Sequence, residues 1–89
     1  MADCGEFRQY ITKVPDPASK LQRQLGAIVL TERQARRLTQ QELAFAADLS
    51  LTYVGEIERG QRMVSLDTLL RIARALQLTG AQLLAKAGI

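Results

Sequence analysis

The sequence predicts a single all-α domain, and three observations lead to this prediction. Hydrophobic residues make up 47 % of the 89 residues and aromatic residues only 4 %, with no Trp, so the apolar supply is mainly Leu, Ala, Ile and Val, which suits closely packed helices. These residues recur at the three-and-four spacing of a helical face, and no stretch shows the alternation typical of a strand. Ser or Thr also precedes four of the apolar segments, as expected at helix N-caps.

A stretch with two prolines, Val14–Lys20 (VPDPASK), divides the chain. Each proline disfavours helix at the residue before it, so we assign residues 1–19 to an N-terminal extension with a linker and residues 20–89 to the folded domain. One short segment of the extension has helical spacing. It either docks on the domain or on a partner, or stays disordered, because so short a helix is marginal alone. Its apolar residues are Phe7, Tyr10, Ile11 and Val14.

Two helices are expected at the start of the domain. The first runs from about Pro17 to Arg37, and its apolar side consists of Leu21, Leu25, Ile28 and Val29. The second begins after Thr39, because the sequence TQQE is a capping box: Thr39 accepts from the Glu42 amide and Glu42 accepts from the Thr39 amide. The inward residues of this helix are Leu43, Ala44 and Ala47.

Three further helices follow, each after its own capping residue. Ser50 caps the third helix, Ser65 the fourth, and Thr79 a short fifth helix. The inner face of the third helix is expected to consist of Tyr53, Val54 and Ile57. The core candidates of the fourth helix are Leu66, Leu69, Leu70, Ile72, Ala73 and Leu76.

Charge and composition narrow the possible functions. The formal net charge is +3, and the excess lies in residues 21–89, where nine basic residues stand against six acidic ones, a mild lean toward an anionic partner. The chain has no His, no nucleophile beside a base and no metal-ligand cluster, so we expect no catalysis, metal, cofactor or small-molecule ligand. Cys4, the only cysteine, is expected to be a free thiol, which favours the cytoplasm. Neither a signal peptide nor a membrane span is expected.

Residues 40–59 carry the most specific pattern in the chain. Two short helices are separated by a three-residue turn, which requires them to cross closely at a steep angle. Ala44 is small enough to permit this approach, Leu49 fills the corner of the turn, and Val54 and Ile57 pack the second helix down. The outward face of that helix is then free to enter a groove of DNA.

The motifs LTQQELA, IERG and SLDTLLRIARAL follow one another in this order. Residues 21–84 therefore resemble a lambda-repressor-like helix-turn-helix domain, and more narrowly the Cro/C1 (XRE) family of transcriptional regulators. The resemblance implies a compact five-helix fold whose second and third helices form the helix-turn-helix. Asp48 departs from the family, which most often has glycine in the turn, but aspartate tolerates a left-handed backbone. Gly55, in mid-helix, either permits close approach to DNA or a neighbour or is simply tolerated.

The resemblance gives opposite roles to the two acidic residues of the third helix. Glu58, in IERG, is expected to form a structural ion pair with Arg33 of the first helix. Glu56 points the other way, and either accepts from a cytosine amine in the major groove or is a surface charge paired with Arg59 or Arg62. The residues expected to face the bases are Leu51, Thr52, Gly55 and Glu56.

Contacts to the DNA backbone are expected to supply most of the affinity, because the base-facing residues lack the bidentate groups of Arg or Gln. Gln40 and Gln41 begin the second helix, whose N-terminal amides suit a phosphate. Tyr53 either reaches a phosphate through its hydroxyl or packs in the core. The expected phosphate contacts are Gln40, Gln41, Tyr53, Arg59, Arg62 and Arg37.

Selective recognition by so small a domain requires a dimer, in which two recognition helices enter successive major grooves roughly 34 Å apart. Apolar residues near the C-terminal end are expected to form the interface, with the alternative that Leu78 and Leu83 close the core. The expected dimerisation residues are Leu78, Leu83, Leu84 and Ile89.

Together these features predict a cytoplasmic, homodimeric regulator of transcription that binds double-stranded DNA at a two-fold symmetric operator, as a repressor or autoregulator. The alternative is a protein–protein interaction module on the same helical fold with little affinity for DNA. The biological role stays open between a stand-alone repressor, a restriction–modification controller, an antitoxin and a phage or plasmid switch.

Overall fold

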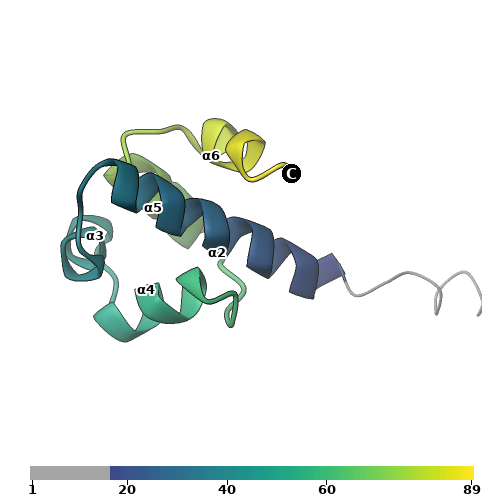
Figure 1. Ribbon diagram of the computed structural model, residues 1–89, viewed down its shortest axis with the longest axis horizontal. Helices are drawn as coiled ribbons and strands as arrows, with labels where there is room; N and C mark the ends of the chain where they lie inside the picture. Colours follow the sequence, from purple (N-terminus) through teal and green to yellow (C-terminus); the bar gives the residue numbers. More distant parts are fainter. Residues whose placement is uncertain (1–16) are drawn as a thin grey trace, which may run out of the picture.

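The computed structural model describes residues 17–89, which form five helices and no strand. The helices are α2 (Pro17–Ala35), α3 (Gln40–Ala47), α4 (Leu51–Glu58), α5 (Leu66–Ala75) and α6 (Gly80–Lys86). The long helix α2 runs through the middle of the domain, with α4 on one side of it and α6 on the other, and α2 packs against both (Figure 1). Helix α3 packs against α4 and α5. The prediction of an all-α fold is confirmed.

The helices begin where the sequence predicts. Thr39 and Glu42 form the expected capping box at α3, and Ser50 and Ser65 accept hydrogen bonds from the third amide of α4 and α5. Thr79 forms a full capping box with Gln82, in addition to the N-cap expected there. Each cap satisfies amides that a helix start leaves without an intrahelical partner, so the starts are fixed by local sequence alone.

The helix ends depend on residues with a left-handed backbone. Asp48, after α3, has φ 58° and ψ 49°. This confirms that aspartate adopts the left-handed backbone for which the family usually has glycine. Arg37 and Gln77 have positive φ values of 58° and 60° after α2 and α5. Helix α2 therefore ends at Ala35, two residues before the expected Arg37, because a left-handed residue cannot continue a right-handed helix.

Residues from all five helices build one core. Its fully buried members include Val29, Leu43, Ile57, Ile72 and Leu76. Tyr53 and Leu49 are half-buried and pack against this core.

Two expected core residues of α5 are instead exposed. Leu66 is 70 % exposed and Leu70 is 37 % exposed, which corrects the prediction for both. Leu66 is the first residue of α5, directly after its cap, and it faces outward there. Leu66 and Leu70 have helical spacing, but they lie at the edge of the apolar face of α5 and not at its centre.

The N-terminal boundary is only partly described. Helix α2 begins at Pro17 as expected, so the boundary assigned between residues 19 and 20 falls inside this helix. Cys4 and the Phe7–Val14 segment lie outside the described residues. Across residues 17–89, no helix has both the length and the apolar character needed to cross a membrane.

Gly26 lies where α2 packs against the C-terminal end of α4. A side-chain carbon added at Gly26 would overlap the carbonyl oxygen of Ile57 and lie 3.0 Å from the carbonyl oxygen of Glu58. Both are backbone atoms, which cannot swing aside as the end of a flexible side chain can. The absence of a side chain at Gly26 therefore sets how closely α2 and α4 approach each other.

Replacing Gly26 by alanine is expected to lower the free energy of unfolding by about 2 kcal/mol. Overpacking against backbone costs about 3 kcal/mol, at the upper end of its usual range, and alanine recovers about 1 kcal/mol through its better helix propensity. Urea denaturation followed by circular dichroism measures the difference.

Gly55→Ala is the matched control, because Gly55 also lies in mid-helix. A side-chain carbon there meets the Arg59 guanidinium at 3.1 Å, and that group can move. We expect this variant to be unchanged or stabilised by up to about 1 kcal/mol. Equal stabilities of the two variants would contradict the tight packing of α2 against α4.

Candidate nucleic-acid interface

The α3–turn–α4 unit presents one face of α4 to solvent. Val54 and Ile57 are each 1 % exposed and hold α4 on the core. Leu51 and Thr52, at the N-terminal end of the same helix, are exposed. The three-residue turn from Asp48 to Ser50 matches the prediction, so the expected recognition helix has a buried side and a free side.

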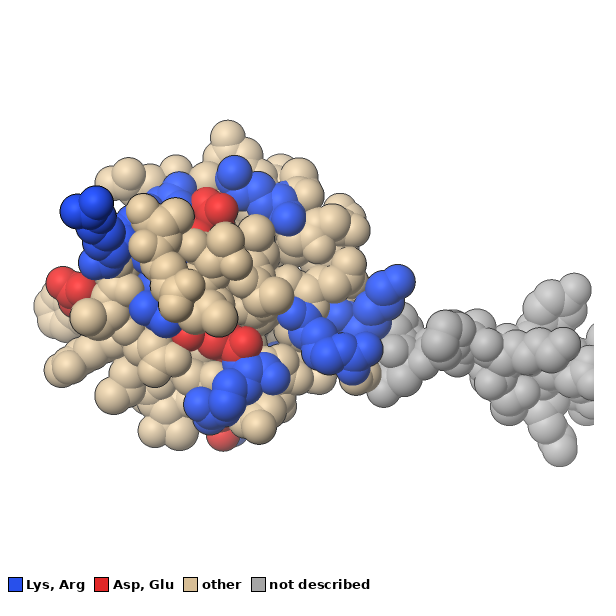
Figure 2. Space-filling view, in the orientation of Figure 1, with Lys and Arg blue, Asp and Glu red and all other residues tan. Residues whose placement is uncertain are grey.

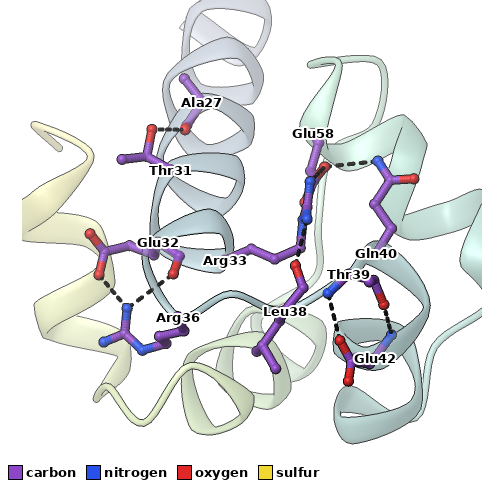
Figure 3. A network of polar contacts seen from close by, with 10 residues as sticks. All are labelled: Ala27, Thr31, Glu32, Arg33, Arg36, Leu38, Thr39, Gln40, Glu42 and Glu58. Atoms are coloured by element: carbon purple, nitrogen blue, oxygen red, sulfur yellow. Dashed lines mark hydrogen bonds and ion pairs between the residues drawn. The ribbon is translucent and has the colours of Figure 1, made fainter.

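A buried ion pair joins α4 to α2. The Arg33 Nε donates to Glu58 Oε2 at 2.6 Å and Arg33 Nη2 donates to Glu58 Oε1 at 3.2 Å, with side-chain exposures of 11 % and 3 %. Arg33 Nη1 also donates to the Leu38 carbonyl at 2.7 Å, and Gln40 Nε2 donates to Glu58 Oε1 at 2.8 Å (Figure 3). The structure thus contains the expected pair and extends it into a network of α2, α3 and α4.

The contact between Gln40 and Glu58 was not predicted. Gln40 is the first residue of α3 and was expected to donate to a phosphate, but its side-chain amide already donates to a buried carboxylate. One amide hydrogen of Gln40 is committed to that bond, and the other is the only one left for a phosphate. Gln41, the next residue, is exposed. No local sequence signal reveals the bond between Gln40 and Glu58, because the two residues lie 18 positions apart.

A hollow of about 440 Å³ lies on the outer side of α4, lined by Ser50, Thr52, Tyr53, Glu56 and Arg62. Across it Arg62 Nε donates to Glu56 Oε1 at 3.1 Å. The Arg62 guanidinium also lies over the Tyr53 ring, 5.7 Å from its centroid. Of the alternatives left open for Glu56, the structure contains the surface ion pair, with Arg62 rather than Arg59 as the partner.

Arg59 covers Gly55. Gly55 is buried, and a side-chain carbon added there would lie nearest to the Arg59 guanidinium. Arg59 itself is exposed, and its Nε donates to Gln61 Oε1 at 3.2 Å. Gly55 is expected to face the bases; in the free protein Arg59 covers it, and a contact of Gly55 with DNA stays a prediction.

Basic residues are divided into separate groups on the face seen in Figure 2. Lys and Arg lie there in several groups, with Asp or Glu beside some of them. Arg37 is exposed beyond the end of α2. Within residues 17–89, no three His, Cys, Asp or Glu side chains lie close enough together to hold a metal ion.

The expected dimerisation residues are divided between core and surface. Leu83 is 0 % exposed, so its side chain closes the core and cannot contact a second copy, which corrects that expectation. Leu78 and Leu84 are half-buried and pack against the core, whereas Ile89 is 50 % exposed. Leu66, at the start of α5, is a further exposed leucine.

Replacing Arg33 by methionine is expected to lower the free energy of unfolding by about 3 to 5 kcal/mol. The change leaves the Glu58 carboxylate buried without its charge partner. A double variant, Arg33→Met with Glu58→Leu, is expected to recover much of this loss because it removes both charges. Thermal denaturation compares the two variants.

Asp67→Asn is the control for the loss of an ion pair. Asp67 pairs with Arg71 at 3.0 Å, but both side chains are largely exposed, so we expect a loss below about 1 kcal/mol. Losses of similar size for Arg33→Met and Asp67→Asn would show that burial does not increase the contribution of the Arg33–Glu58 pair to the free energy of unfolding.

Known proteins show the same architecture. The helix-turn-helix family matches residues 30–83, more than half of the chain. The control protein C.SmaI of Serratia marcescens is 38 % identical over 65 residues, which cover 73 % of this chain and 77 % of that protein. The control protein C.BamHI of Bacillus amyloliquefaciens is 51 % identical over 39 residues, 44 % of this chain and only 48 % of that protein, so the chain spans about half of its length.

A solved structure agrees with these relatives. The restriction–modification controller protein C.AhdI from Aeromonas hydrophila superposes with a TM-score of 0.68 and 40 % sequence identity, covering 70 % of this chain and 94 % of that one. The chain therefore belongs to the Cro/C1-type (XRE) helix-turn-helix family of transcriptional regulators.

Proposed function

We propose that this protein is a sequence-specific transcriptional regulator that binds a two-fold symmetric operator in double-stranded DNA as a homodimer. The free face of α4, held in place by the buried Arg33–Glu58 pair, is the observation that carries the proposal. We infer that the protein acts by binding rather than by catalysis and that it works in the cytoplasm.

Base recognition is assigned to the N-terminal half of α4, which enters the major groove. Helix-turn-helix proteins concentrate their base contacts at this end of the helix. Leu51 is 49 % exposed and is suited to contact a thymine methyl group. Thr52 is exposed beside it and offers a hydroxyl to a base or a phosphate. Neither side chain forms a bidentate contact, so recognition relies on shape and methyl groups.

Affinity is assigned to contacts with the DNA backbone. The N-terminal amides of α3 and the exposed Gln41 are suited to one phosphate. Arg59 and Arg62, in the segment after α4, reach the backbone on the other side of the groove, and Arg37 adds a more distant contact. Tyr53 supports Arg62 through its ring, and its hydroxyl remains a candidate phosphate donor.

Dimerisation is assigned to the outer surface of α5 and α6. Leu66 and Leu70 are one helical turn apart on α5, and Leu70 lies against Gly80 at the start of α6. Leu84 is one turn further along α6, and the exposed Ile89 follows it. A two-fold axis would place this surface against its own copy, which is the usual arrangement of a homodimer.

The role of a restriction–modification controller is the one that the similarities favour. C.AhdI, described as such a controller, is matched over 94 % of its chain at 40 % identity. We therefore propose that the operator of this protein lies in front of genes of a restriction–modification system.

Selection of bound duplexes from a random pool tests the proposed function. We expect a two-fold symmetric motif whose half-sites are about one helical turn apart, because two copies of α4 must enter successive major grooves. Binding should also weaken steeply with salt. Absence of enrichment, with no binding at low salt, would instead favour the protein–protein interaction module.

Leu66→Glu is expected to weaken the dimer at least tenfold, because it places a charge in an apolar interface. Analytical ultracentrifugation measures the dissociation constant. Phe45→Glu is the matched control, because Phe45 is 88 % exposed but lies on α3. A dimer that tolerates Leu66→Glu would exclude the α5–α6 surface as the interface.

A further inference from the structure

Glu56 places a negative charge on the surface that is proposed to face DNA. It lies on α4, its side chain is 29 % exposed, and it lines the same hollow as Thr52. An acidic side chain in this place repels phosphates unless a cation or a hydrogen-bond donor neutralises it. In the structure Arg62 provides that partner at 3.1 Å.

The pair also occupies Arg62. Arg62 Nε donates to Glu56, and the guanidinium is held over Tyr53, so one of the few arginines near α4 is engaged within the protein. Its side chain is 58 % exposed, however, and a partly exposed ion pair contributes little to stability and exchanges easily. The Glu56–Arg62 pair is therefore formed in the free protein but can open at little cost when DNA binds.

Each member of the pair has an alternative partner on DNA. A phosphate competes with Glu56 for the guanidinium, because arginine binds phosphate and carboxylate with the same geometry. Cytosine N4 and adenine N6 carry the amine donors of the major groove, and a carboxylate on α4 can accept from either. If Arg62 leaves and no base amine is present, Glu56 is left without a partner beside the phosphates.

We propose that Glu56 makes the phosphate contact of Arg62 conditional on the base sequence. On the operator, a base amine takes the place of Arg62 at Glu56, and the released Arg62 binds a phosphate. On other sequences Arg62 stays on Glu56, and the phosphate contact is not made. Glu56 is thus a specificity-determining residue that lowers affinity for non-operator DNA, an inference that rests on the proposed function.

The test compares Glu56→Gln with the wild-type protein on two duplexes, the selected operator and a random sequence of the same length, over a series of salt concentrations. Glutamine keeps the shape but releases Arg62. On random DNA we expect several-fold tighter binding, and a salt dependence steeper by about 0.9 in log K against log salt, the value for one added phosphate contact. The ratio of operator to random affinity should fall by about tenfold, within the range for one base contact.

Arg62→Ala supplies a second measurement. In the wild-type background it should weaken operator binding and leave the salt dependence on random DNA nearly unchanged, because Arg62 makes no phosphate contact there. The affinity for random DNA should fall only through the Glu56 charge that is left unpaired. In the Glu56→Gln background Arg62→Ala should remove the gain on random DNA together with the added salt dependence. This difference between backgrounds separates release of Arg62 from a general reduction in negative charge.

Glu32→Gln is the matched control. Glu32 pairs with Arg36 at 2.8 Å, and Figure 3 shows this pair on the opposite side of α2 from Arg33 and Glu58. The substitution makes the same change in net charge and also breaks an acid–arginine pair. We expect it to change neither the salt dependence on random DNA nor the ratio of affinities.

The outcomes are distinguishable. If the wild-type protein binds no DNA at low salt, the proposed function is wrong. If it binds a selected operator but Glu56→Gln leaves random-DNA affinity and its salt dependence unchanged, or if Glu32→Gln has the same effect, only the role of Glu56 is overturned.

Discussion

Burial of the Glu58 carboxylate against Arg33 constrains the placement of α4 relative to α2 and α3. An ionised carboxylate that is 3 % exposed is tolerated only when its oxygens are paired, and here Arg33 of α2 and Gln40 of α3 share them. The geometry of these bonds fixes the C-terminal end of α4 relative to two other helices. Buried pairs often add little stability compared with apolar residues of similar size, so the gain from this pair is the fixed orientation of α4.

The same constraint explains how α4 carries two acidic residues and still serves as a recognition helix. Glu56 and Glu58 are two positions apart, so they project toward different sides of the helix. Glu58 is neutralised inside the protein by Arg33, and Glu56 is neutralised at the surface by Arg62. Only Glu56 therefore lies on the surface that is proposed to face DNA, and only its ion pair is exposed enough to exchange partners.

Local sequence predicted most of the fold, and long-range packing accounts for what it missed. Thr39, Ser50, Ser65 and Thr79 each cap a helix within three residues, so the helix starts could be identified from short motifs. The Arg33–Glu58 pair was expected from a family resemblance rather than from spacing. The bond from Gln40 to Glu58 and the contact of Gly26 with the α4 backbone join residues far apart in sequence, and no periodicity reveals them.

A regulator with a net charge of only +3 gains selectivity if its cations are not all available to any DNA. Phosphate contacts strengthen operator and random binding alike, and a genome offers a great excess of random sites. The base contacts proposed for Leu51 and Thr52 would discriminate weakly, because neither side chain can form bidentate contacts with a base edge. Withholding Arg62 from random DNA raises the ratio of affinities beyond what the base contact of Glu56 supplies alone, because discrimination depends on the difference between the two binding free energies. A single acidic residue on a recognition helix can thus favour operator binding over random binding even though it carries the same sign of charge as DNA.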